Sequence, residues 1–392
     1  MKKILALILA AIVILAVAAC GSSAPAAPAA PADGGQQEAA APADTPAAED
    51  SDSGTGAYSA LYLCNGSLGD KGFYDNAASG FYRLRDELGW EIKIIEMGRD
   101  ETTYEGYFLD EVEKDWDLIV SGTFSIRDML EEMAVRFPEQ NFMGFDIAID
   151  FDKVTTGNAI GVTYQSNETG FMGGALAALM LGSGAEKIDA SRPVLGFVGS
   201  MDTPNINDFL IGYIEGIQYI NPDIRLLTSY IGSFNDVPKG YEMTTQLYNL
   251  GAQIVYAPAS QSILGAVQAS ADSDRYFVAC DNDIWSMMHE TDPDMVANIL
   301  SSTMKNVGNS IFDAASGLKE GTFQLGQNYT LGIKDDAVGL AKNANFEALV
   351  PADIRAQLND IASQIANGTI VVGTAFGMET DAVAALRDGM SP

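Results

Sequence analysis

The sequence predicts an α/β fold of two doubly wound parallel-sheet lobes joined by a hinge. Apolar strand-like runs alternate with amphipathic helix patterns from residue 58 to residue 280, which is typical of βαβ units and parallel sheets. Glycine and small polar residues follow most of these runs. The region 58–392 is too long for one ordinary hydrophobic core and suits two. These observations together predict two lobes of similar architecture.

The first half of this region alternates in a regular way. Strand-like runs occupy residues 58–64, 90–97, 118–120, 142–147 and 160–163. Helices are predicted at 75–88, 126–137 and 168–181, where apolar residues recur at helical spacing or small residues dominate. The glycines and alanines of 168–181 predict that this helix packs closely against a neighbour.

The second half repeats the alternation. Strand-like runs occupy residues 194–198, 225–231, 254–257, 276–280 and 296–301, and helices are predicted at 206–220, 238–250 and 263–271. We expect residues 58–164 to form the N-terminal lobe, with a return segment near 302–320, and residues 165–301 to form the C-terminal lobe. Residues 321–392 contain a helix-like stretch at 354–365 but are not assigned to a lobe.

The N-terminus resembles a bacterial lipoprotein signal. Two lysines precede an unbroken apolar run at 4–19, and the run ends at Cys20. We expect residues 1–19 to be a signal peptide and Cys20 to be lipidated, which would hold the protein on the extracytoplasmic face of the cell membrane. An ordinary signal peptide with an incidental cysteine, or an uncleaved anchor, are the alternatives. Residues 20–57 are rich in alanine and proline, which predicts a disordered tether.

Composition excludes several classes of function. The net charge of −31 argues against binding of nucleic acid or of an anionic membrane by the folded region. The chain has one histidine, His289, so no Ser-His-Asp, Cys-His or histidine-rich metal site is predicted. Cys64 and Cys280 follow apolar runs and are expected to be small core residues, although a disulfide between them stays open. We expect no enzyme activity, no cofactor and no metal.

The position of the polar clusters predicts a binding cleft. They follow the strand-like runs at 65–67, 121–123, 199–200, 232–233, 259–260 and 281–283. In open α/β sheets, ligands bind outside the carboxyl ends of the strands. Two lobes that face each other would line one cleft with these loops, and the cleft would close by a hinge motion.

Several motifs resemble the basic membrane protein family. They occur in the family's order at residues 65–75, 196–204, 230–236, 278–283 and 301–305. The first reads Asn-Gly-Ser-Leu-Gly-Asp-Lys-Gly-Phe-Tyr-Asp and is similar to the family's first-strand loop. The family comprises lipoprotein substrate-binding components of ABC transporters, and several members bind purine nucleosides. The resemblance implies a type I periplasmic-binding fold, a nucleoside in the cleft and an ABC permease as partner. We expect the protein to be a monomer.

Two phenylalanines are candidates for holding the base. A purine needs flat apolar faces, and one aromatic ring from each lobe can enclose it. Phe73 lies in a polar loop and Phe209 in the predicted helix 206–220. Phe73 would otherwise be a packing residue at a helix start, and Phe209 also fits the core stripe of its helix.

A carboxylate and a cation are candidates for holding the ribose. Vicinal hydroxyls are recognised well by a carboxylate next to a cationic donor. Asp281 follows an apolar strand, which would bring it to the cleft; a helix cap is its alternative role. Lys305 corresponds to a lysine that lies near the sugar in the family; otherwise it is an ordinary surface lysine.

Four further residues complete the predicted binding set. Asp146 ends a strand-like run and could pair with base nitrogens, and Asp70 could do the same or simply cap its own loop. Ser260 and Gly232 lie in loops where backbone groups would meet the ligand.

Other functions remain compatible with the sequence. The same fold could bind a sugar or a signal molecule, because sugar clefts also use aromatic rings and carboxylates. The protein could also act as a surface sensor or adhesin. An enzyme with a glycosidase-like carboxylate pair ranks last, since no motif positions such a pair.

Overall fold

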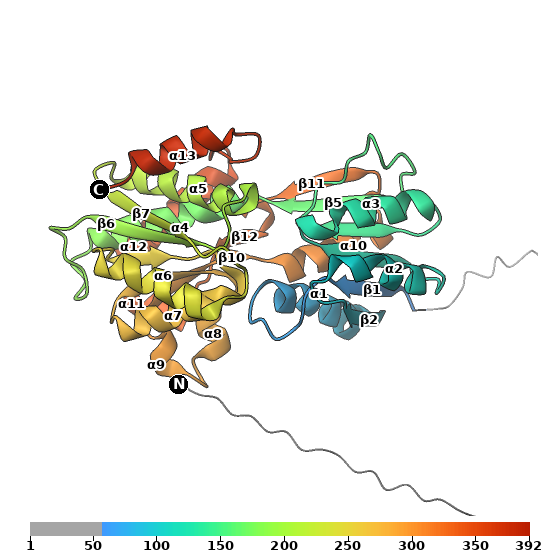
Figure 1. The fold of residues 1–392 in the computed structure, drawn as a ribbon, viewed down its shortest axis with the longest axis horizontal. Helices are drawn as coiled ribbons and strands as arrows, with labels where there is room; N and C mark the ends of the chain where they lie inside the picture. Colours follow the sequence, from blue (N-terminus) through green and yellow to red (C-terminus); the bar gives the residue numbers. More distant parts are fainter. Residues whose placement is uncertain (1–56) are drawn as a thin grey trace, which may run out of the picture. The chain divides into compact units, whose positions relative to one another are not determined.

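The computed structural model describes residues 57–392. Within this range, the strands form two six-stranded sheets with helices packed around them (Figure 1). This arrangement confirms the predicted two-lobe α/β fold. The predicted signal peptide, the lipidation site Cys20 and the tether up to residue 56 lie outside the described residues.

The first sheet is parallel throughout. Its strands run in the order β2 (Glu91–Glu96), β1 (Ser59–Cys64), β3 (Leu118–Gly122), β4 (Phe142–Phe145), β5 (Ala159–Tyr164) and β11 (Gln327–Leu331). Strand order reverses direction at β1, which is the doubly wound arrangement that places a ligand site at the carboxyl ends of the strands.

Both faces of this sheet are covered by helices. The helices are α1 (Phe73–Leu88), α2 (Tyr104–Val112), α3 (Arg127–Arg136) and α10 (Val307–Glu320). In β1, Tyr62 joins the core formed with α1 and α10, and its neighbour Leu63 joins the core formed with α2 and α3. This alternation follows from the two-residue period of a strand. Helix α2 was not predicted, because its short sequence has a weak apolar pattern.

The second sheet has the same order with one antiparallel edge. Its strands are β7 (Arg225–Tyr230), β6 (Val194–Gly199), β8 (Ile254–Tyr256), β9 (Tyr276–Asp281), β10 (Ile299–Lys305) and β12 (Val338–Leu340). Only the pairing of β12 with β10 is antiparallel within this sheet. The two lobes therefore repeat one architecture, as the alternating sequence pattern predicts.

The helices of the second lobe also cover both faces of its sheet (Figure 1). They are α4 (Ser166–Leu181), α5 (Pro204–Ile220), α6 (Val237–Asn249), α7 (Ile263–Asp272), α8 (Ile284–Met288), α9 (Pro293–Val296), α11 (Ala344–Leu349), α12 (Ala352–Ala366) and α13 (Thr380–Gly389). Helices α4 and α5 lie on one side of the sheet, and α6 and α7 on the other. No helix within residues 57–392 has the length and apolar character needed to cross a membrane.

Helices α4 and α5 approach each other at their glycines. A β-carbon at Gly170 or Gly174 would overlap backbone atoms of α5, and one at Gly212 or Gly216 would overlap backbone atoms of α4. This contact confirms the close packing predicted from the small residues of 168–181. It fixes α5, which carries Phe209, firmly against the second lobe.

The chain crosses between the lobes at three places. It passes from β5 to α4 at Gln165, from β10 to α10 at Asn306, and from β11 to β12 through residues 332–337. The return segment expected near residue 302 begins later, because β10 continues to pair with β9 as far as Met304. The unassigned residues 321–392 divide: β11 joins the first sheet, and β12 with α11, α12 and α13 belongs to the second lobe.

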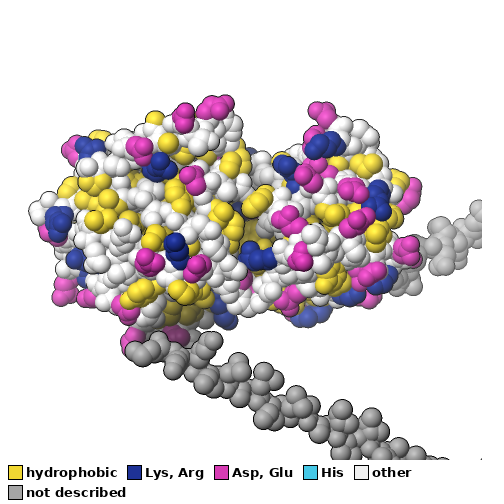
Figure 2. Space-filling model, in the orientation of Figure 1, with side chains coloured by type: hydrophobic (Ala, Val, Ile, Leu, Met, Phe, Trp, Pro, Cys, Tyr) yellow, Lys and Arg dark blue, Asp and Glu magenta, His cyan; other side chains and the backbone are white. Residues whose placement is uncertain are grey.

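Acidic side chains are spread over both lobes rather than gathered in one patch on the face shown in Figure 2. Basic side chains lie among them. Cys64 and Cys280 are buried and free, so the open question of a disulfide between them is answered in favour of two core thiols.

Candidate binding site

A cavity of about 290 Å³ lies between the two lobes. Its volume is close to the lower end of the ~300–1,000 Å³ range of small-molecule pockets. The lining comes from both lobes, mainly from the carboxyl ends of strands and the helix starts that follow them. It consists of Asn65, Phe73, Tyr74, Arg99, Glu101, Tyr104, Thr123, Phe124, Ser125, Asp146, Ser200, Asn205, Ile206, Phe209, Phe234, Pro258, Ser260, Asp281 and Lys305.

Strand order decides how these residues are arranged along the cavity. The strands β4, β9 and β10 lie toward the crossings and bring Asp146, Asp281 and Lys305 to one end, called here the hinge end. The edge strands β2 and β7 bring Arg99 and Phe234 to the opposite, outer end. The cavity therefore carries charged side chains at both ends, and the rings of Phe124 and Phe234 lie at its outer end.

An ion pair joins the lobes at the hinge end. Lys305 Nζ lies 2.6 Å from Asp146 Oδ1, and the two side chains are 6% and 17% exposed. Asp281 completes the charged group. Burial raises the pKa of Asp281 to about 6; the Lys305 ammonium opposes this rise, and the carboxylates of Asp146 and Asp70 add to it. Asp281 is thus mostly ionised at neutral pH and takes up a proton in mildly acidic solution.

Three aromatic rings surround the same ammonium. Lys305 Nζ lies 5.1 Å from the ring centroid of Tyr164, 5.3 Å from that of Phe73 and 5.9 Å from that of Phe209. These distances are within the range of cation–π attraction. Phe73 begins α1 in the first lobe and Phe209 lies on α5 in the second, and both line the cavity. Each lobe therefore contributes one buried phenylalanine to the hinge end.

Several lining residues have an unusual backbone. Thr123, Asp146, Ser260 and Asp281 each follow or end a strand, and their φ angles are 74°, 59°, 49° and 69°. Residues other than glycine seldom adopt positive φ, and such strain is typical of functional sites. Thr123, with ψ of 157°, occupies a region that is almost restricted to glycine. The fold holds these residues in place against a local backbone cost.

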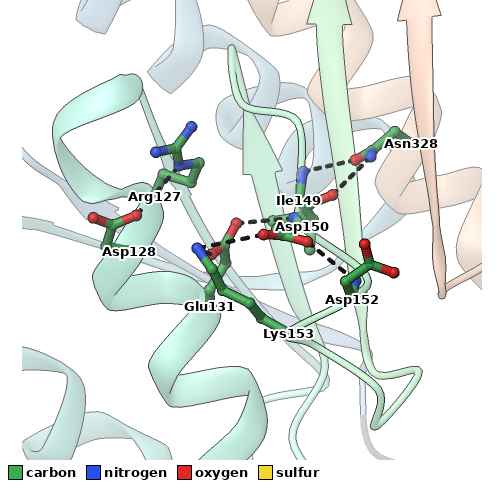
Figure 3. Close-up of polar contacts among 8 residues, drawn as sticks. All are labelled: Arg127, Asp128, Glu131, Ile149, Asp150, Asp152, Lys153 and Asn328. Atoms are coloured by element: carbon green, nitrogen blue, oxygen red, sulfur yellow. Dashed lines mark hydrogen bonds and ion pairs between the residues drawn. The ribbon is translucent and has the colours of Figure 1, made fainter.

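The loop after Asp146 is fastened by polar contacts (Figure 3). The Asn328 side chain donates to Ile149 O at 2.9 Å and accepts from Ile149 N at 2.8 Å. The buried carboxylate of Glu131 accepts from Asp150 N at 2.9 Å, and Lys153 lies 3.4 Å from both Glu131 and Asp150. These bonds tie the loop to β11 and α3, and so steady the end of β4 that presents Asp146.

The structure brings most of the predicted binding residues together. Phe73, Asp146, Phe209, Ser260, Asp281 and Lys305 all line the cavity. Asp70 and Gly232 lie outside this lining. The Asp70 carboxylate accepts from the N–H groups of Gly72, Tyr74 and Asp75 at 2.9–3.1 Å, so it holds the start of α1. Gly232, with φ of 80°, forms a turn and donates to Ser200 O at 2.7 Å.

Other lining residues were not singled out from the sequence. Asn65 is 2% exposed, and its Nδ2 donates to Thr123 Oγ1 at 2.7 Å and Ser125 Oγ at 3.0 Å. At the outer end, the rings of Phe124 and Phe234 come from different lobes and their centroids lie 6.4 Å apart. The polar clusters after the strands identified these loops, but did not say which side chains turn inward.

The fold and the cavity define a two-lobed ligand-binding protein. A family model described as "ABC transporter substrate-binding protein PnrA-like" matches residues 58–374. The chain belongs to this family of ABC transporter substrate-binding proteins, which confirms the resemblance found in the sequence.

Relatives agree with this assignment, and a solved structure shares the fold. The chain is 27% identical over 313 residues to basic membrane protein A2 of Borrelia garinii subsp. bavariensis, covering 79% of this chain and 86% of the relative. It is 24% identical over 326 residues to the CD4+ T-cell-stimulating antigen of Listeria monocytogenes, with 80% and 87% covered. An ABC transporter solute-binding protein of Aeropyrum pernix K1 superposes with a TM-score of 0.69 at 22% identity, covering 85% of this chain and 98% of that one.

Proposed function

We propose that this protein binds a purine nucleoside in the cavity between its lobes and delivers it to an ABC permease. The observation that carries the proposal is the pair of buried phenylalanines, Phe73 and Phe209, contributed by opposite lobes to the hinge end of one cavity. A planar base between two such rings gains stacking on both faces, and base–aromatic stacking is worth roughly 1–3 kcal/mol per base.

The charged group at the hinge end suits a ribose. Asp281 at neutral pH is a carboxylate that can accept from two vicinal hydroxyls, and Lys305 lies on the neighbouring strand to donate to them. Asp146 accepts from Lys305 and so orients the ammonium. In this proposal, Asp146 acts on the sugar through Lys305, in addition to the contact with base nitrogens expected from the sequence.

A sugar is the second candidate. Carboxylates and aromatic rings also suit sugar hydroxyls and C–H faces, and the ~290 Å³ cavity would hold one. A solute-binding protein of Actinobacillus succinogenes with bound D-allose has a TM-score of 0.56 and 10% identity to this chain. This similarity concerns the fold and not the binding residues. The presence of one phenylalanine ring from each lobe favours the nucleoside, because a planar base can stack on both rings.

We also propose that the mature protein is a monomer anchored by lipid at Cys20 on the extracytoplasmic face of the membrane. The support is the apolar run that ends in Val-Ala-Ala-Cys at residues 17–20. Growth of cells with a labelled fatty acid should label the wild-type protein and leave a Cys20→Ala variant unlabelled. Label on both proteins, or on neither, would contradict the anchor.

Thermal unfolding in the presence of ligands tests the main proposal. A ligand at ~100 times its dissociation constant adds about 2.7 kcal/mol to the free energy of unfolding. Adenosine, guanosine, inosine, their free bases and a set of sugars would be compared, before and after unfolding and refolding to remove any carried ligand. A stabilisation by a nucleoside supports the proposal. Stabilisation by a sugar alone would leave the fold and replace the ligand.

A further inference from the structure

The Asn282 side chain joins the two lobes next to the cavity. Asn282 directly follows Asp281 at the end of β9 in the second lobe and is 6% exposed. Its Nδ2 donates to Gly72 O at 2.6 Å, and its Oδ1 accepts from Asn76 Nδ2. Gly72 and Asn76 belong to the first lobe. Both ends of this amide are therefore bonded across the gap between lobes.

These bonds connect the backbones of two cavity residues. Gly72 immediately precedes Phe73, and Asn282 immediately follows Asp281. Asp281 has the strained φ of 69°, and the turn after it is short, because Asn282 N donates to Cys280 O at 2.9 Å. A strained residue keeps its conformation only where its surroundings fix it. The contact with Gly72 and Asn76 supplies such a constraint from the opposite lobe.

Asn76 extends the connection to the crossing at residue 306. Its Oδ1 accepts from Gly308 N at 2.7 Å, at the start of α10, and its Nδ2 also lies 3.3 Å from Lys305 O. One amide in α1 thus contacts the loop that carries Asp281 and the strand end that carries Lys305. Both proposed sugar-binding residues are therefore linked to these amides. Lys305 is linked through its own backbone carbonyl, and Asp281 through the adjacent Asn282.

We propose that Asn282 is a positioning residue that couples closure of the lobes to the placement of Asp281 and Phe73. When the lobes are apart, the Asn282 amide bonds to water and the Asp281 turn loses its support. When they close, the amide binds Gly72 and Asn76, and the carboxylate and the aromatic ring are fixed together. The role in binding rests on the proposed nucleoside function; the coupling between lobes does not.

The test compares Asn282→Ala with Ser286→Ala in the full-length chain. Ser286 bonds to Asp283 in the same region of the second lobe and is exposed, so its variant controls for local loosening. Association and dissociation rates would be measured for adenosine, guanosine and inosine. Asn282→Ala should lower nucleoside affinity about tenfold. The hydrogen bonds that it removes together account for a change of roughly tenfold to hundredfold in the dissociation constant. The loss should lie mostly in faster dissociation, and Ser286→Ala should match the wild type.

Hydrogen exchange, measured both without ligand and with each nucleoside, separates positioning from a local structural effect. Asn282→Ala should speed amide exchange at residues 72–76, in the opposite lobe, and an Asn76→Ala, Asn282→Ala pair should show non-additive losses of affinity. Exchange at residues 72–76 that is unchanged both without and with nucleoside would overturn the coupling. Altered exchange with unchanged nucleoside affinity would overturn the role in binding. Failure of the wild type to bind any of the three nucleosides would instead refute the proposed function.

Discussion

Lys305 and Asp146 form an ion pair between the two lobes at the hinge end of the cavity. The Nζ–Oδ1 distance is 2.6 Å, and the Lys305 side chain is 6% exposed. The residues lie far apart in the chain, at the ends of β10 and β4. A charge left alone in such a place is costly, so each residue depends on the other for its charged state to be tolerated.

Replacement of Lys305 by methionine should therefore destabilise the ligand-free protein strongly. Removal of one partner of a buried pair costs about 3–5 kcal/mol, because the remaining charge is left unpaired. Equilibrium unfolding in denaturant would measure the loss. A Lys305→Met, Asp146→Leu double variant should recover much of it. Lys305→Arg keeps the positive charge and serves as the control. If Lys305→Met is as stable as Lys305→Arg, the ion pair contributes little to stability.

Asp281 should make stability depend on pH in a defined window. Its pKa is raised to about 6 by burial, whereas an unfolded aspartate titrates near ~3.9. Since the folded protein holds this proton more tightly than the unfolded chain, the free energy of unfolding should fall as pH rises from ~4 to ~6 and then level off. Asp281→Asn should remove about 2–3 kcal/mol of this fall, measured as the difference between wild type and variant at each pH. A constant difference across the window would contradict the raised pKa.

Nucleoside affinity should show the opposite dependence on pH. Ribose hydroxyls donate to the ionised carboxylate, so affinity should weaken below pH ~6 as Asp281 takes up its proton. Titration calorimetry at several pH values would measure this. Asp281→Asn should bind weakly at every pH. An equal slope in wild type and variant would assign the dependence to another group.

Loss of either phenylalanine ring should weaken nucleoside binding. Phe73→Ala and Phe209→Ala should each cost roughly 1–3 kcal/mol of binding free energy, the value of one stacked face. Because Phe209 is also buried in the core of its lobe, Phe209→Leu serves as the control that keeps apolar volume without a flat ring. A leucine variant that binds as tightly as the wild type would exclude stacking at this position.

Asp70 should matter for stability and little for binding. Its carboxylate accepts from N–H groups of Gly72, Tyr74 and Asp75, and loss of such a cap costs about 0.5–2 kcal/mol. Asp70→Ala should lower the unfolding free energy by this amount, while Asp70→Asn keeps part of it. Affinity should change far less than in Asp281→Ala. An equal loss of affinity in Asp70→Ala and Asp281→Ala would show that Asp70 contacts the ligand after all.

The case of Asp70 shows the limit of residue type as a signal. Asp70, Asp146 and Asp281 stand at or after the ends of strand-like runs, and the sequence predicted each as a ligand contact, with a structural cap as the alternative for Asp70 and Asp281. In the structure, the carboxylate of Asp70 turns back on its own loop, whereas Asp146 and Asp281 turn into the cavity. Direction of the side chain follows from local φ and from neighbouring elements, which a one-dimensional pattern does not contain.

The amino-acid sequence by itself determined the alternation of strands and helices, the division into two lobes and the loops that meet at the cleft. These features depend on periodicities of two and 3.6 residues and on glycine and polar residues at strand ends, all of which are local. Only the tertiary structure decided that Lys305 pairs with Asp146, that Phe124 faces Phe234 and that Asn282 bonds to Gly72. Each of these contacts joins residues from different lobes, and it exists because the crossings bring the carboxyl ends of two separate sheets face to face.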